Sequence, residues 1–169
     1  MMIFDRDKRY NNFYGELIIH AAIFISISLN IFSSISIVDF SLLTCLIVYF
    51  SKENKVKWHY SVLIFLWGVY SDLIIGYPIG FSSAIFLFFL LLNQISNFFG
   101  LFVIGEIRFI VFATGLLLVS TVEYLTIYLQ FSTNISIYLQ ALEILFILIV
   151  YYPINYFIKI NFNLYATKE

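Results

Sequence analysis

The chain has 169 residues, of which 62% are hydrophobic and 21% aromatic, whereas only 11% are charged and the mean hydropathy is +0.97. A soluble domain carries about 25% charged residues, so this chain has too few to cover a surface that faces water. The formal net charge of -1 excludes the basic field that nucleic-acid binding needs. One cysteine and two histidines exclude a disulfide framework and supply too few ligands for a zinc site or a thiolate cluster. An integral membrane protein is expected.

Six membrane-spanning helices are expected in a single polytopic domain, residues 1–169, because spanning takes about 20 apolar residues per helix. The uncharged run that begins at Leu17 is too long for a signal peptide, so it is expected to be retained. One helix from Leu17 to Phe50 would be about 51 Å long against about 30 Å of hydrocarbon, which predicts a break between Ser33 and Asp39. The expected helices are residues 17–34, 38–50, 58–75, 81–104, 109–129 and 137–158, the second being short.

The connectors between these helices are polar or rich in turn-forming residues. A basic loop, residues 51–57, precedes the third helix, and a turn at residues 76–80 follows it, because Pro78 lacks a backbone donor and glycine tolerates positive φ. The remaining connectors are expected at residues 105–108 and 130–136.

The basic residues predict the orientation, since short cytoplasmic loops carry the excess of Lys and Arg. With six crossings and a cytoplasmic N-terminus, the inner segments hold all nine: Arg6, Lys8, Arg9, Lys52, Lys55, Lys57, Arg108, Lys159 and Lys168. Both termini are therefore expected on the cytoplasmic side of the membrane. A second helix that did not span would put the basic loop on the opposite side from the N-terminal cluster.

Four acids fall in or at the edge of the expected spans, where a charge is costly: Asp39, Asp72, Glu123 and Glu143. One interpretation is a polar cavity, open to the outside, that binds a cation, a proton or a polar ligand. The alternative, which we favour, is that Asp39 caps its helix, Asp72 is solvated near the interface, and the two glutamates are protonated and hydrogen-bonded between helices.

Other polar residues in the apolar segments have structural explanations. Asn93 and Gln94, midway along the fourth expected helix, are expected to form hydrogen bonds between helices. His20 is expected to be an interfacial histidine rather than a proton relay. Gly68, Asp72 and Gly76 recur every four residues and therefore share one face of the third helix, which predicts a surface for close packing inside the bundle or against a partner.

The segment Trp67-Gly68-Val69-Tyr70-Ser71-Asp72-Leu73-Ile74-Ile75-Gly76-Tyr77-Pro78-Ile79-Gly80 resembles the signature of the MreD rod shape-determining family, approximately G-L-x-x-D-L-x-x-G-x-P-L-G. Gly68, Asp72, Leu73, Gly76, Pro78 and Gly80 match, whereas Val69 and Ile79 replace leucines. The chain length, the acid that opens the second helix and the basic loop also look like the family. Family members often carry proline before that acid, where this chain has Val38.

The resemblance implies a non-enzymatic scaffold of the bacterial cell-elongation machinery in the inner (cytoplasmic) membrane. It also implies a fold similar to the six-helix substrate-binding subunits of energy-coupling-factor transporters. The implied partners are MreC, the MreB filament and the elongation peptidoglycan synthases. The face of Gly68, Asp72 and Gly76 is then expected to dock a partner's helix, and the basic loop to face cytoplasmic partners and anionic lipid. No cofactor or metal is expected.

The sequence leaves two other functions as alternatives to the scaffold. A substrate-capture subunit of a vitamin transporter is the alternative, although such subunits usually carry A-x-x-x-A in the first helix and here Ala21 and Ala22 are adjacent. A membrane enzyme is less favoured, because no nucleophile and base pair or set of metal ligands is visible in the sequence.

Overall fold

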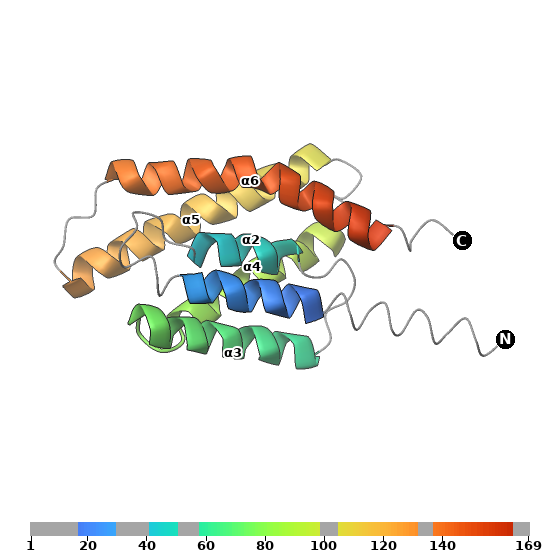
Figure 1. Ribbon diagram of the computed structural model, residues 1–169. Helices are drawn as coiled ribbons and strands as arrows, with labels where there is room; N and C mark the ends of the chain where they lie inside the picture. Colours follow the sequence, from blue (N-terminus) through green and yellow to red (C-terminus); the bar gives the residue numbers. More distant parts are fainter. Residues whose placement is uncertain (1–16, 30–40, 51–57, 99–104, 132–136, 164–169) are drawn as a thin grey trace.

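The computed structural model describes residues 17–29, 41–50, 58–98, 105–131 and 137–163, and these residues form an all-α structure. The N-terminal helix covers Leu17–Leu29. It is followed by α2 (Ser41–Phe50), α3 (Trp58–Ile75), α4 (Phe81–Phe98), α5 (Gly105–Phe131) and α6 (Ile137–Asn163). Successive helices run in alternating directions, so the bundle has two ends (Figure 1). The N-terminal helix begins, and α6 ends, at the same end of the bundle.

Six helices agree with the prediction from sequence, but several boundaries differ. The expected connector at residues 105–108 is wrong, because these residues form the first turn of α5. None of them is a proline, and an acid such as Glu106 interacts favourably with the N-terminus of a helix. α5 and α6 also extend beyond the expected ends, to Phe131 and Asn163. The expected helix residues 30–34, 38–40 and 99–104 lie outside the described residues.

α2 is the shortest described helix and lies at the centre of the bundle. Figure 1 shows it between the N-terminal helix and α6, with α4 behind it. Its side chains are buried on more than one face, including Leu42, Cys45, Leu46 and Tyr49. Since an element surrounded by other helices needs no polar side, the absence of charge from its ten residues is explained by its position.

Aromatic rings form much of the core between α2, α5 and α6. The ring of Phe112 on α5 lies 5.0 Å from that of Tyr49 on α2 and 5.2 Å from that of Tyr151 on α6, measured between centroids. Such spacing is typical of favourable aromatic pairs. Two residues beyond Tyr151, Pro153 lies inside α6. Proline removes one helical hydrogen bond and bends the helix, and α6 visibly bends along its length in Figure 1.

The outward surface of the other helices is strongly apolar. More than half of the side-chain surface is exposed at Ile25 of the N-terminal helix, Leu66 of α3, Leu91 of α4, Leu118 of α5 and Ile149 of α6. By length and composition, α3 and the segment Ile107–Thr126 of α5 are each apolar enough to cross a membrane. At 1.5 Å per residue, the 18 residues of α3 span about 27 Å.

Candidate functional site

The residues that resemble a family signature build the hairpin between α3 and α4. α3 ends where the N–H of Gly76 donates to the carbonyl oxygen of Asp72 at 2.8 Å, with φ of +86° at Gly76. This is a glycine C-cap in the left-handed conformation. The turn continues through Pro78, whose carbonyl accepts from the N–H of Phe81 at 3.0 Å, and Gly80 has φ of +99°. Glycine is therefore required at both positions for its backbone conformation.

The Asp72 side chain holds the start of α4. Its Oδ2 accepts from the N–H of Gly80 at 2.7 Å and its Oδ1 accepts from the N–H of Ser82 at 2.8 Å. Backbone N–H groups at the beginning of a helix, such as these two, have no acceptor within the helix itself. Asp72 thus caps α4 from the last turn of α3, and only 1% of its surface is exposed. The expectation that it is solvated is wrong, because the N-terminus of α4 replaces water.

Gly68 allows α3 and α4 to approach very closely. A Cβ atom at this position would lie 2.3 Å from the Cα of Ser83 and 2.5 Å from its backbone nitrogen. The Ser83 hydroxyl also donates to the carbonyl of Phe65 at 2.9 Å. α4 therefore occupies the face of α3 that carries Gly68 and Asp72. The expected docking of a partner's helix on this face needs correction, since the chain's own next helix fills it.

A second polar cluster surrounds Arg108, which was expected in a cytoplasmic loop. That expectation is wrong: Arg108 lies in α5 and is only 3% exposed. Its Nη2 donates to Asn93 Oδ1 on α4 at 3.2 Å, and its Cζ lies 4.9 Å from the ring centroid of Phe50 and 5.5 Å from that of Tyr49. The amide oxygen and the faces of two aromatic rings make burial of the guanidinium tolerable.

The backbone around Arg108 is tied to α2 as well. The Tyr49 hydroxyl donates to the carbonyl oxygen of Arg108 at 3.2 Å and lies 3.5 Å from the Ser96 hydroxyl of α4. The cluster therefore joins α2, α4 and α5. The expected hydrogen bond of Asn93 between helices is present. An amide in the middle of an apolar helix was the signal in the sequence that a polar partner lies nearby, but it did not identify Arg108.

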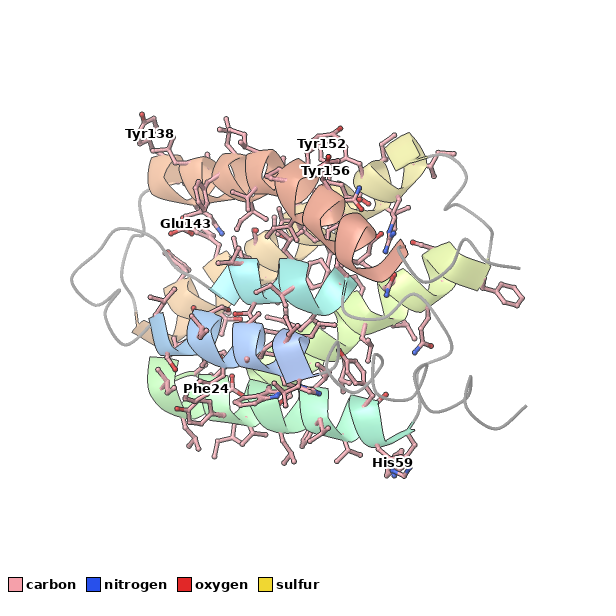
Figure 2. The ribbon with its side chains drawn as sticks, turned by 45° about the vertical axis from the view of Figure 1, so that its right-hand side comes forward. Phe24, His59, Tyr138, Glu143, Tyr152 and Tyr156 are labelled. Carbon is pink, nitrogen blue, oxygen red and sulfur yellow. The ribbon has the colours of Figure 1, made fainter. Side chains whose placement is uncertain are left out.

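Two of the other acids that the sequence analysis singled out lie on other helices than Asp72. Glu123 on α5 is only 7% exposed, and Glu143 on α6 is half-buried. Figure 2 shows Glu143 on the side of α6 that faces the bundle, opposite Tyr138. Both glutamates have interaction partners. Asp39 lies outside the described residues.

A groove of about 380 Å³ lies between α5 and α6. Its lining includes Leu117, Tyr124 and Ile144, together with the polar residues Ser120 and Gln140. Gln140 Nε2 donates to the carbonyl of Ser120 at 2.5 Å. The buried Ser120 hydroxyl, in contrast, finds no hydrogen-bond partner within the described ranges.

Nothing in the described ranges resembles a metal centre: no three His, Cys, Asp or Glu side chains are grouped so as to hold an ion. Compared with known proteins, the chain matches no family model, no curated protein and no solved structure. Three features of the described structure bear on function: the hairpin of α3 and α4, the Arg108 cluster, and the groove between α5 and α6.

Proposed function

We propose that the protein is a membrane protein that crosses the bilayer six times, with both termini in the cytoplasm. Large apolar side chains cover the outside of the bundle, and a soluble protein rarely exposes continuous apolar surface of this extent. The alternating helices place the start of α5 and the end of α6 at one end of the bundle (Figure 1). Lys159 belongs to the last turns of α6 and supports a cytoplasmic location of that end under the positive-inside rule, whereas Arg108 is buried in the bundle and adds nothing to it.

Reporter fusions test the orientation. A fusion after Asn54 is expected to read as cytoplasmic and one after Thr133 as external. The opposite result at either position would contradict six crossings with a cytoplasmic N-terminus.

Within that membrane, we propose a non-enzymatic scaffold of bacterial cell elongation that works with MreC, MreB and the elongation peptidoglycan synthases. The observation that carries this proposal is that the residues resembling the MreD signature act together. Gly68 admits the backbone of α4, Asp72 caps that helix, and Gly76 and Gly80 take positive φ between them.

A scaffold of this kind acts by presenting the outer faces of its helices. Since α4 covers the Gly68 face, a partner's transmembrane helix is expected to dock elsewhere on the exposed apolar surface. Depletion in the native host, followed by imaging, tests the function: cells should become round and recover when the wild-type gene is restored. Cells that keep their shape during verified depletion would overturn the scaffold proposal.

One observation favours the alternative, a substrate-capture subunit of an energy-coupling-factor transporter. The groove between α5 and α6 is large enough for a small ligand, and the Ser120 hydroxyl that lines it could take a hydrogen bond from one. Loss of vitamin uptake on depletion without rounding, together with a small molecule retained by the purified protein, would support this function over the scaffold.

A further inference from the structure

The N-terminal helix and α3 meet along a seam of rings that includes a polar contact. Trp67 Nε1 on α3 donates to His20 Nδ1 at 3.1 Å, and the two rings are stacked at 6.5 Å between centroids. Tyr60 lies on one side of this contact, 5.5 Å from the His20 ring. Phe24 lies on the other side and contacts both Trp67 at 5.8 Å and Tyr70 at 6.2 Å. Phe24 is seen where the two helices meet in Figure 2.

The direction of this hydrogen bond fixes the state of the imidazole. An indole N–H can only donate, so His20 Nδ1 must present its lone pair. The imidazole is therefore neutral and carries its proton on Nε2. An imidazolium has N–H groups at both nitrogens, so protonation would turn Nδ1 into a donor that faces another donor. The contact as built exists only with neutral His20.

His20 has a further interaction, and Glu16, four residues earlier in the sequence, lies outside the described residues. The groups considered next belong to the described helices that pack against His20. On α3, the phenol ring of Tyr60 is the titratable group that faces His20. The Asp72 carboxyl, also on α3, accepts its hydrogen bonds from the start of α4 instead. α2, which touches the N-terminal helix through Thr44 and Ser26, has no charged residue. The hydroxyl of Tyr49 on α2 is directed to α4 and α5.

We propose that His20 and Trp67 form a proton-sensitive latch between the N-terminal helix and α3. Neutral His20 holds the seam closed, and protonation breaks the hydrogen bond and loosens the N-terminal helix. Histidine is the side chain that changes charge between about pH 5 and pH 8. In the proposed orientation His20 lies in the first turn of its helix, near the cytoplasmic surface, so the latch would respond to cytoplasmic acidification. Its chemistry does not rest on the scaffold function.

Tryptophan fluorescence tests the latch in the purified full chain, held in lipid nanodiscs. The chain has two tryptophans, and Trp58 is 75% exposed, so Trp58→Phe leaves Trp67 as the only reporter. Its emission is expected to change along a one-proton curve between pH 8 and pH 5. His20→Gln keeps an acceptor for the indole but cannot take up a proton, so the change should be lost.

His59→Gln is the matched control, because His59 is exposed and points away from the bundle at the start of α3 (Figure 2). The pH response should persist in that variant. A flat response in Trp58→Phe, or a response that survives His20→Gln, would overturn the proposal.

A second measurement at constant pH separates opening of the seam from a purely spectroscopic effect. Cysteines replace Phe24 and Tyr70, and Cys45 is changed to Ala, so that a short bifunctional thiol reagent can bridge the seam. At pH 8, His20→Arg, whose guanidinium stays charged in proteins, is expected to lower the yield of the cross-link relative to His20→Gln. Equal yields in these two variants would show that charge at this position does not open the seam.

Discussion

Replacing Gly68 with alanine is the most direct perturbation of the hairpin. The added Cβ would lie 2.3 Å from the Cα of Ser83, and ordinary contact begins at 3.4 Å, so α3 and α4 must separate locally by about 1.1 Å (3.4 − 2.3). The Cα of Ser83 is a backbone atom and the added Cβ is bonded directly to the backbone, so no side-chain rotation relieves the contact. Overpacking of this kind costs about 1–3 kcal/mol, and the rigid neighbour places Gly68→Ala in the upper part of that range.

Gly115→Ala provides a matched control within the same bundle. Gly115 is also a buried glycine inside a helix, but its added Cβ would meet Leu92 Cδ1, at 2.5 Å. A methyl group at the end of a flexible side chain can rotate away. Both substitutions gain about 1 kcal/mol of helix propensity, so the difference between them isolates the backbone clash. Gly115→Ala should be close to neutral, whereas Gly68→Ala should be destabilised.

Unfolding by sodium dodecyl sulfate in detergent micelles, followed by circular dichroism, measures the difference. The midpoint of Gly68→Ala should fall below those of the wild type and Gly115→Ala. If the two variants unfold at the same point, the close approach of α3 to α4 at Ser83 is refuted.

Two further predictions concern the buried polar groups. Asp72→Ala should lower the free energy of unfolding by about 1–3 kcal/mol for each helix N–H left without an acceptor. Asp72→Asn keeps one carbonyl oxygen and should lose less stability. Equal losses of the two variants in the same unfolding assay would argue against capping of α4. Asn93→Leu should be destabilising by about 1–3 kcal/mol, because it removes a hydrogen-bond acceptor of the buried Arg108 guanidinium. Combining Asn93→Leu with Arg108→Leu should recover part of that loss. Strictly additive losses in this double-mutant cycle would contradict the bond between the two side chains.

The approximate positions of the helices could be predicted from the sequence, because long uncharged apolar runs are compatible with few structures other than buried or membrane-spanning helices. The turn at residues 76–80 was equally readable, since two glycines and Pro78 mark it chemically. Boundaries at residues 105–108 were misplaced because Glu106 and Arg108 suggested solvent. A charge in the sequence does not reveal whether water or an amide and aromatic rings will surround it.

Which helices fill which faces could not be predicted. The spacing of Gly68 and Asp72 identified a face for close packing, but a sequence pattern does not name the neighbour that uses it. The contact between His20 and Trp67 joins residues 47 positions apart. No local rule pairs residues at that separation, because it depends on how the N-terminal helix lies against α3.

In the proposed membrane topology, the cap that Asp72 places on α4 also bears on how the chain would enter the bilayer. Its two acceptor bonds reach residues only eight and ten positions further along. α3 inserted alone would carry a carboxyl group without these partners, at a substantial cost in hydrocarbon. As soon as Ser82 follows, the same carboxyl receives its donors without waiting for any later helix. In that topology, α3 and α4 are therefore suited to enter the bilayer together, as one hairpin, during synthesis.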